Sequence, residues 1–298
     1  MPNSLSDFLN KTECEYREHQ NLARMSYIKV ETSARYVVYP ESIQKLKDVL
    51  RGLHSKPINY VILGRMSNVL FKDRVYNGVV IKTDRIRTSR IKENLIDLEC
   101  GCALPTIARQ LSGCNLGGFE GLLGIPGSIG GMLKQNAGAF GYQISDRCID
   151  CTVYDIKNEK NILIKCENMN FGYRTSILKD RNLVLLSARF EAIEKPENTI
   201  REEIDRYLSI RRNTQPITQP SLGSVFKRVG DVSAGYYIDQ LNLKGISVGG
   251  AQISKKHAGF IVNNSGATAS DILKLMDIVK SAVLHEYGIT LEEEIEII

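Results

Sequence analysis

The stretch GLLGIPGSIGGMLKQNAGAFG, from Gly121 to Gly141, decides the fold that we expect. It combines a run of glycines with one proline and an Asn-Ala-Gly turn, and this density argues against an ordinary helix or strand. Glycine loses more conformational entropy on folding than any other residue, so such a run needs a compensating reason. We therefore expect the backbone here to lie very close to another group, either in the chain itself or in a ligand.

Two explanations of these glycines stay open from the residues alone. They serve tight turns and close packing, or their bare N–H groups face a large flat or anionic ligand that a Cβ would hold away. The spacing does not match the two common nucleotide loops. No Gly-x-Gly-x-x-Gly opens a helix after a strand, and no Gly-Lys-Ser/Thr follows, so neither a Rossmann fingerprint nor a Walker loop is supported.

A second glycine turn lies upstream of this stretch. The residues Asn59 to Leu63, NYVIL, predict a short buried strand that ends on Gly64, and Arg65-Met66-Ser67-Asn68 follows. A strand that leads into Gly-x-x-Ser-Asn predicts a phosphate cradle, in which Ser67 and Asn68 donate beside backbone amides. A plain connection from strand to turn explains the same residues equally well.

Composition and charge limit the classes of function that we expect for this protein. A chain of 298 residues accommodates two or three modest domains, and 43% hydrophobic with 24% charged residues is ordinary for a soluble globular protein. The net charge of +5 is spread among acids, so nothing argues for a nucleic-acid partner. A doubly or triply negative small molecule is compatible with it.

The N-terminal sequence is polar and acidic where a signal peptide would be basic and then apolar, and no apolar run has the length of a membrane span. We therefore expect a cytoplasmic enzyme with no membrane partner. The seven cysteines are an odd number and are expected to be free thiols. Cys100-Gly-Cys102 and Cys148-Ile-Asp-Cys151 could form a four-thiolate metal site, but the first spacing is unusual for zinc and we expect no metal.

Hydrophobic periodicity predicts the other elements. We expect a short N-terminal helix in residues 1–20 and a linker at Pro216 to Pro220. Predicted helices cover residues 43–53, 103–111, 201–212, 235–241 and 270–287, the last ending at Gly288. Predicted strands cover residues 27–39 (one or two), 69–71, 78–82, 94–99, 148–154, 162–165, 183–190, 246–253 with a Gly249-Gly250 bulge, 260–263 and 294–298.

With these elements in order, the chain resembles the UDP-N-acetylenolpyruvoylglucosamine reductase (MurB) family, from about residue 20 to the C-terminus. The short interval between Arg174 and Ser224 resembles the branch that lacks an inserted lid segment. The motifs that carry the resemblance are Gly64 to Asn68, Gly124 to Gly131 with Asn136 to Ala139, Phe171 to Ser176, Pro220 to Lys227, Gly249 to Gln252 with Lys256 to Ala258, and Leu291 to Glu294.

The resemblance implies a mixed α/β (α+β) fold. A two-part FAD-binding region of the vanillyl-alcohol-oxidase-like type would occupy residues 1–82 and 83–212, and a C-terminal α/β substrate-binding domain would occupy residues 213–298. It implies non-covalent FAD and NADPH as cofactors, a UDP-sugar substrate and a monomer. The activity implied is reduction of UDP-N-acetylglucosamine enolpyruvate to UDP-N-acetylmuramate for peptidoglycan synthesis, and hence a role in cell-wall biogenesis and cell shape.

Three residues match the family's catalytic set, namely Arg174, Ser224 and Glu294. Hydride addition to an enol ether leaves negative charge that spreads onto the neighbouring carboxylate. An arginine stabilises this charge by a bidentate contact, a hydroxyl supplies the proton to carbon, and a carboxylic side chain helps only if it is held protonated.

Further site residues follow from the same motifs. The resemblance implies that the cofactor is bound by Gly64, Arg65, Ser67, Asn68, Gly124, Ile125, Pro126, Gly127, Ser128, Gly131, Asn136, Gly138 and Ala139. It implies that the substrate is bound by Tyr173, Lys227, Gln252 and His257.

The chain departs from the family pattern in places. Met66 stands where the family has the second glycine of Gly-x-Gly-Ser-Asn, and it adds bulk and a φ restriction to the predicted cradle. Lys29 begins Lys-Val-Glu-Thr-Ser where many members have Arg-Ile-Gly-Gly-Pro, and Arg228 replaces an asparagine. Two hypotheses stay open, an authentic reductase and a diverged protein with lost or altered FAD binding that acts on or binds a related nucleotide sugar.

Overall fold

The helix predicted from residue 43 forms as α2 (Ile43–His54). Ser42 caps it, because its side chain accepts a hydrogen bond from the backbone N–H of Lys45, and the apolar face with Leu46, Val49, Leu50 and Leu53 is buried. The computed structural model describes residues 5–298, apart from the side chains of residues 108 and 109. α2 belongs to the first of two compact units into which the chain folds.

The two units are discontinuous in sequence. The first contains residues 1–18, 36–65 and 78–209, and the second contains residues 19–35, 66–77 and 210–298. Each unit has its own hydrophobic core, one built around residues such as Ile81 and Phe190, the other around residues such as Phe226 and Met276. The three-part division predicted at residues 82 and 212 stays a prediction.

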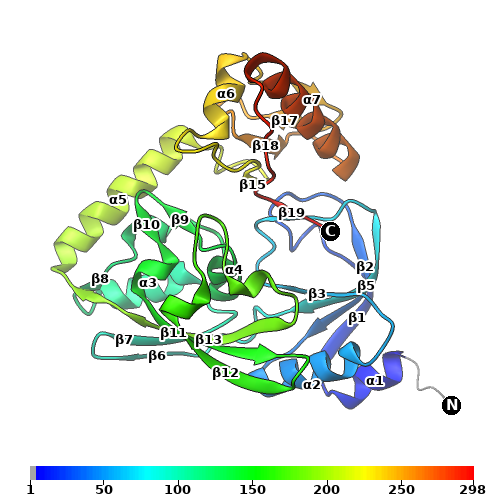
Figure 1. Ribbon diagram of the computed structural model, residues 1–298, viewed down its shortest axis with the longest axis vertical. Helices are drawn as coiled ribbons and strands as arrows, with labels where there is room; N and C mark the ends of the chain where they lie inside the picture. Colours follow the sequence, from blue (N-terminus) through cyan, green and yellow to red (C-terminus); the bar gives the residue numbers. More distant parts are fainter. Residues whose placement is uncertain (1–4) are drawn as a thin grey trace. The chain divides into compact units, whose positions relative to one another are not determined.

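The first unit contains a five-stranded antiparallel sheet (Figure 1). The strand order is β12 (Lys160–Lys165), β11 (Cys148–Asp155), β13 (Leu183–Glu191), β7 (Leu95–Glu99) and β6 (Ser89–Lys92). The other elements with most of their residues in this unit include α1 (Leu5–Lys11), β3 (Tyr60–Leu63), β5 (Val75–Lys82), α3 (Leu104–Ser112), β8 (Leu116–Gly117), α4 (Ile129–Lys134), β9 (Gly138–Ala139), β10 (Tyr142–Gln143), β14 (Ile193–Glu194) and α5 (Glu197–Thr214), with 3-10 turns at Glu120–Leu122, Ile144–Arg147, Cys166–Met169 and Ile177–Lys179.

A four-stranded sheet has the order β1 (Glu15–Asn21), β2 (Ser33–Tyr39), β5 and β3. β3 and β5 are parallel, with Leu63 opposite Lys82, so their carboxyl ends lie at the same edge. The predicted glycine turn at Gly64 therefore begins where Lys82 ends β5.

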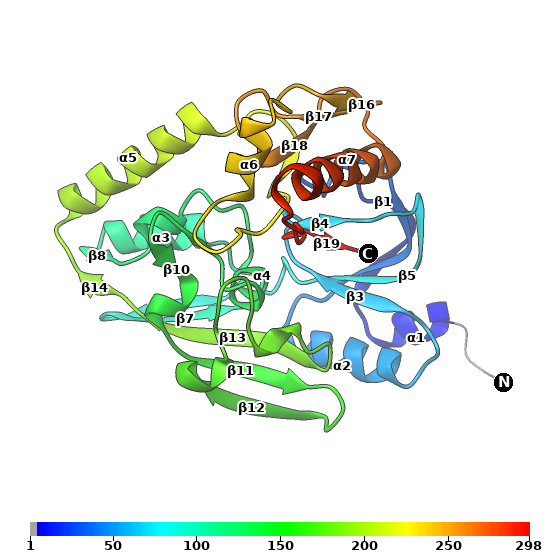
Figure 2. The ribbon, with the colours of Figure 1, turned by 45° about the horizontal axis from the view of Figure 1, so that its top comes forward.

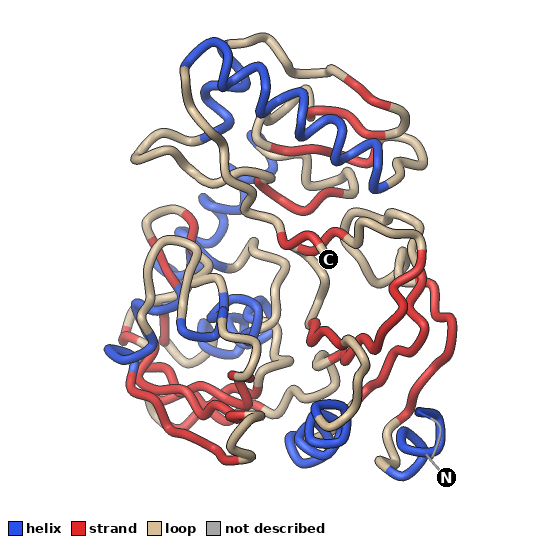
Figure 3. The backbone as a smooth tube through the Cα atoms, turned by 45° about the vertical axis from the view of Figure 1, so that its right-hand side comes forward, coloured by secondary structure: helices blue, strands red, loops and turns tan. Residues whose placement is uncertain are grey.

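The second unit contains an antiparallel sheet covered by the long helix α7 (Ala269–Tyr287), as Figures 2 and 3 show. The sheet order is β15 (Ser221–Ser224), β18 (Phe260–Asn263), β17 (Ala251–Ile253) and β16 (Ser247–Val248). α6 (Ala234–Gln240) contributes to the same core, and β19 (Glu296–Ile297) pairs in parallel with β4 (Val69–Leu70). The predicted stop of α7 is confirmed, because Gly288 ends it with φ +66°.

Two predictions near the N-terminus are wrong in part. β1 was not predicted, because its polar sequence EYREHQN has no apolar alternation and it lies at the edge of the sheet. The strand expected from Tyr27 begins only at Ser33, since Lys29 has φ +57° and interrupts the extended backbone. Ile28 and Val30 are buried in the core of the second unit instead. Residues 1–4 of the predicted N-terminal helix lie outside the described residues.

The predicted strand over residues 246–253 is in fact a hairpin. Val248 pairs with Ala251 and Ser247 pairs with Gln252, so Gly249 and Gly250 form the two-residue turn between β16 and β17 and are not a bulge. Gly249 has φ +52°, a conformation that favours glycine. Two adjacent glycines between short apolar runs are the usual hairpin signal, and the strand prediction overlooked it.

The glycine-rich stretch also differs from expectation, because it contains the short helix α4 and β9, the first strand of the β9–β10 hairpin. The prediction that its glycine density rules out a helix or strand is wrong. In residues 5–298, no helix is both long enough and apolar enough to span a membrane.

Candidate active site

The glycines of α4 pack against the chain itself. The N–H groups of Ile129 and Gly130 donate to the carbonyls of Cys102 and Cys100, at 2.9 and 2.8 Å. A Cβ on Gly130 would lie 3.3 Å from the Cys100 oxygen, which is tighter than an ordinary contact. At Gly130, close packing therefore explains the glycine. Ser128, one residue before α4, is buried.

The two predicted cofactor loops meet at Gly64. A Cβ on this glycine would lie 2.0 Å from the Ser128 Oγ, so no side chain fits there. The Gly64 carbonyl accepts a hydrogen bond from the Nζ of the buried residue Lys82. Ile125 is partly buried, and Pro126 and Gly131 are exposed, as is Arg65. The structure thus brings Gly64 and Ser128 together, as the family motifs imply.

The hairpin that follows α4 is tied to helix α5. Its turn residues, Phe140 and Gly141, both have positive φ, +54° and +83°, as two-residue hairpin turns require. The Phe140 ring stacks on Tyr207 of α5 at a centroid distance of 4.8 Å. The Tyr142 hydroxyl donates to Glu203 of α5 at 3.1 Å. These contacts with α5 hold the hairpin in position, and with it Gly138 and Ala139 of β9.

Arg174 lies in a tight turn beside this hairpin. Gly172 and Thr175 exchange backbone hydrogen bonds of 3.2 and 3.4 Å around Tyr173-Arg174, and Arg174 has φ +54°. Its guanidinium lies 5.1 Å from the Tyr173 ring centroid. The Nη2 of Arg174 donates to the Gly138 carbonyl at 3.5 Å. A non-glycine residue with positive φ is often found at functional sites, where surrounding contacts impose it.

Asn136 holds this turn in place. Its buried amide nitrogen donates to the Gly172 carbonyl at 3.1 Å and to the Gln143 side chain at 3.0 Å. Its amide oxygen accepts from the Ser145 N–H at 3.3 Å. The structure therefore places Asn136, Gly138, Tyr173 and Arg174 together in the first unit, and the contacts of Asn136 are those of a residue that positions the arginine turn.

Ser224 and Glu294 lie on paired segments of the second unit. Ser224 ends β15 and follows Gly223, which has φ +79°. The next residue, Val225, accepts a hydrogen bond from the Glu294 N–H at 2.8 Å. Phe226 forms an antiparallel bridge with Glu293. A serine and a glutamate that are 70 residues apart in sequence (224 and 294) thus lie on two segments that are paired through their backbones.

Asn68 fixes the same glutamate from the other side. Its side-chain nitrogen donates to the Glu294 carbonyl at 3.0 Å, and its own carbonyl accepts from the Glu296 N–H at 2.9 Å. The C-terminal segment therefore lies between the residues after β15 and the predicted phosphate cradle. Asn68 connects the cradle to Glu294, and the sequence alone did not reveal this role.

The predicted substrate residues of the second unit make several contacts within the protein. Lys227 pairs with Glu292 at 2.9 Å, and the Gln252 amide donates to Gly245 and Ser247. The His257 Nδ1 accepts from the Gly259 N–H at 3.1 Å. Burial lowers the pKa of His257, and the positive charge of Lys244 lowers it further, so the imidazole is neutral at neutral pH.

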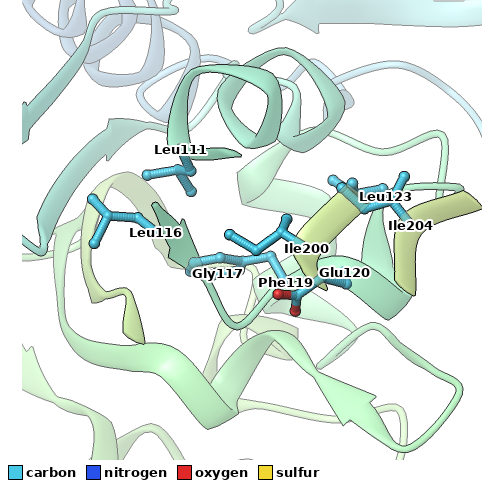
Figure 4. Close-up of a pocket in the computed structure, with 8 residues that line it drawn as sticks. All are labelled: Leu111, Leu116, Gly117, Phe119, Glu120, Leu123, Ile200 and Ile204. Carbon is cyan, nitrogen blue, oxygen red and sulfur yellow. The ribbon is translucent and has the colours of Figure 1, made fainter. Parts of the chain in front are cut away.

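A small apolar pocket in the first unit is a separate feature (Figure 4). It is lined by residues of α3, α5 and the segment between them, with the Glu120 carboxylate at its edge. Glu120 accepts hydrogen bonds from the Gly118 N–H and from Lys195. The residues drawn around the pocket include none of the predicted site residues, so we do not assign the active site to it.

The cysteines are free thiols, as predicted. Burial raises the pKa of Cys100 to about 12 and that of Cys102 to about 11, so both thiols stay protonated. Among the side chains that the structure describes, no group of three or more His, Cys, Asp or Glu residues could hold a metal ion. The four-thiolate alternative is therefore not formed.

Met66 has the backbone of a glycine. Its φ is +53°, and its side chain is only 3% exposed. The position thus keeps the left-handed conformation that a glycine would adopt freely, while the methionine side chain fills space in the core. The methionine thus combines a backbone conformation that suits glycine with a buried apolar side chain.

This geometry predicts an unusual order of stability for variants at residue 66. Both Met66→Ala and Met66→Gly lose a buried side chain, and we expect each to lower the free energy of unfolding by about 1–4 kcal/mol. Only glycine relieves the positive φ, so Met66→Gly should be more stable than Met66→Ala by about 1 kcal/mol. Urea denaturation measures both values. A more stable alanine variant would show that the turn is not left-handed in solution.

The comparisons with known proteins agree with this arrangement. A family model described as an FAD binding domain matches residues 34–165, and one described as the C-terminal domain of UDP-N-acetylenolpyruvoylglucosamine reductase matches residues 215–298. A moss protein, Physcomitrella patens BBE-like 1, shares the fold at a TM-score of 0.50 with 12% identity, over 64% of this chain and 45% of that one. Together with the mixed α/β architecture, these matches define an FAD-dependent oxidoreductase of the vanillyl-alcohol-oxidase-like fold, as predicted.

Closer relatives specify the family. The UDP-N-acetylenolpyruvoylglucosamine reductase of Caldicellulosiruptor bescii is 38% identical over 98% of this chain and 93% of its own length. That of Lactococcus lactis is 35% identical over 98% of both chains. The crystal structure of the Thermus caldophilus enzyme matches at a TM-score of 0.80 with 30% identity, over 96% of this chain and 98% of that one. The chain belongs to the UDP-N-acetylenolpyruvoylglucosamine reductase family.

Proposed function

We propose that this protein reduces UDP-N-acetylglucosamine enolpyruvate to UDP-N-acetylmuramate with electrons from NADPH, as a cytoplasmic monomer in peptidoglycan precursor synthesis. Membership of the reductase family supports the reaction. The observation that carries the proposal is the pairing of the Ser224 and Glu294 segments. In this pairing the backbone of Glu294 is bonded to the residue after Ser224 and to Asn68 of the predicted cofactor cradle, which supports a shared role for the serine and the glutamate.

The residues of the first unit fit FAD. Gly64 and Ser128 approach so closely that no Cβ fits between them, and a buried lysine lies beneath Gly64. Backbone amides at such a turn, together with a nearby cation, suit the pyrophosphate of a dinucleotide. FAD supplies the chemistry of hydride transfer from NADPH to the enolpyruvyl double bond. To its binding we assign the predicted residues of this unit, namely Gly64, Arg65, Gly124, Ile125, Pro126, Gly127, Ser128, Gly131, Asn136, Gly138 and Ala139, and also Ser67 and Asn68 of the second unit.

The remaining steps belong to side chains of this chain. Hydride addition to one carbon of the double bond leaves a carbanion on its neighbour, delocalised onto the substrate carboxylate. Arg174 stabilises this negative charge through a bidentate contact, and the Ser224 hydroxyl donates the proton to the carbanion carbon. The Glu294 side chain donates a hydrogen bond to the same developing charge only in its protonated form. Tyr173, Lys227, Gln252 and His257 are assigned to the UDP-sugar.

The first test is the colour of the protein. We expect it to purify yellow, with FAD that is released on denaturation, because the glycine turns and Lys82 supply donors and positive charge. NADPH should bleach the flavin absorbance, and the enolpyruvyl substrate should restore it. A protein that stays colourless after incubation with excess FAD would contradict the reductase activity and favour a diverged nucleotide-sugar protein.

A further inference from the structure

Lys82 is a buried lysine at the edge where two parallel strands end. It is the last residue of β5, it lies opposite Leu63 of β3, and its side chain is only 2% exposed. Lysine is almost never fully buried unless an opposite charge compensates for its lost hydration. In sheets of this kind, ligands bind at the carboxyl ends of parallel strands. From the position and the burial of Lys82 together, we expect an anion to bind near it.

The groups around Lys82 compensate for its charge only in part. Its Nζ donates to the Gly64 carbonyl and lies 3.4 Å from the Asp84 Oδ1. Burial lowers the pKa of Lys82, Asp84 acts against this, and the positive charge of Arg65 lowers the pKa further. The Asp84 side chain is 43% exposed as a whole, but the Oδ1 that faces Lys82 is buried and accepts no hydrogen bond. Lys82 therefore has a carboxylate at ion-pair distance that does not accept a hydrogen bond from it.

The hydrogen bond from Lys82 also orients the backbone. The described peptide bonds include no cis bond, and in a trans peptide the C=O and N–H groups point in opposite directions. Because the Gly64 carbonyl points toward Lys82, the N–H of Arg65 points away from it. The same turn contacts Ser128, the residue before α4 in the second predicted cofactor loop. Lys82 thus lies behind the point where the two loops meet.

We infer that Lys82 is a positioning residue for the pyrophosphate of FAD. It holds the Gly64 carbonyl so that the following N–H groups face the opposite side of the turn, and it supplies the positive potential that the dianion needs. The inference rests on the FAD binding of the proposed function. The competing explanation is a structural ion pair between Lys82 and Asp84 that exists only to stabilise the fold.

Two variants separate these explanations because they predict opposite signs. Lys82→Met keeps the length of the side chain and removes its charge, and we expect FAD to bind about 10- to 100-fold more weakly, since hydrogen bonds to charged groups contribute strongly. The flavin-free protein should be about as stable as the wild type, because removal of a buried cation offsets the loss of the ion pair and the partly exposed Asp84 side chain is free to turn toward water. Asp84→Asn should leave FAD affinity unchanged or strengthen it, because it removes the competing carboxylate.

The measurement is FAD dissociation from the purified full-length protein, followed by flavin fluorescence on dilution, with urea denaturation of the flavin-free protein alongside. Lys92→Met, at an exposed strand end, is the matched control and should change neither value. FAD affinity of Lys82→Met equal to that of the wild type would overturn the inference. So would a loss of both stability and FAD affinity in Lys82→Met and Asp84→Asn alike. A wild-type protein that binds no FAD would instead contradict the proposed function.

Discussion

Ser224→Ala is expected to slow the transfer of reducing equivalents to the enolpyruvyl substrate by about 10²–10⁴-fold, because a positioned proton donor contributes about that much to the rate. The hydroxyl has a role only after the substrate has bound. Bleaching of the flavin by NADPH should therefore proceed at nearly the wild-type rate. Rapid mixing separates the two half-reactions, and only the second should be affected.

The structure offers a matched control on the same strand. Ser221→Ala removes a hydroxyl from the opposite end of β15, where it pairs with Val262, and should leave both half-reactions unchanged. The backbone hydrogen bond from the Glu294 N–H is accepted by the carbonyl of Val225, the residue after Ser224. Loss of the Ser224 hydroxyl should therefore not disturb the backbone. If Ser224→Ala passed reducing equivalents to the substrate at the wild-type rate, the assignment of Ser224 as the acid would be wrong.

Arg174→Ala is expected to lower kcat/KM by about 10²–10³-fold, the usual loss when one preorganised donor to a developing anion is removed. KM should also rise, because the guanidinium meets the substrate carboxylate already in the ground state. Arg174→Lys keeps the charge without the planar fork and should recover only part of the loss. Steady-state kinetics with varied substrate measures both effects.

The backbone of Arg174 makes this comparison unusually clean. Its φ of +54° strains alanine and lysine alike, so the two variants differ in side-chain chemistry and not in turn strain. Arg181→Ala, an exposed arginine in the turn before β13, should have no effect on kinetics. Equal kcat/KM values for Arg174→Ala and the wild type would remove this residue from the catalytic set.

Several parts of the fold could be predicted from the sequence because their signals are local. The apolar periodicity of α2 and the glycine stop of α7 are properties of neighbouring residues, and both appear in the structure. Edge strand β1 and the Gly249-Gly250 hairpin were not predicted. The first has no apolar pattern, and the second was taken for one continuous strand.

The candidate site, too, could be predicted from the sequence only in part. The motifs identified Arg174, Ser224 and Glu294 by residue type and order, without showing which of them lie together. The sequence likewise marked Met66 as a departure, but its left-handed φ and its buried side chain became visible only in the fold. Lys82 went unnoticed, although a lysine at the end of the apolar run Val79-Val80-Ile81 is a signal that sequence inspection can find.

By itself, the sequence determined the family, the two glycine-rich loops that we propose bind the cofactor and the residue types that the proposed chemistry needs, because these are encoded in short motifs. Only the tertiary structure decided that Asn68 holds the Glu294 backbone, that the Ser224 segment pairs with the C-terminal segment, and that Lys82 lies beneath Gly64. The physical reason is that hydrogen bonds between segments far apart in the chain depend on how the cores bring them together, and no local spacing records that.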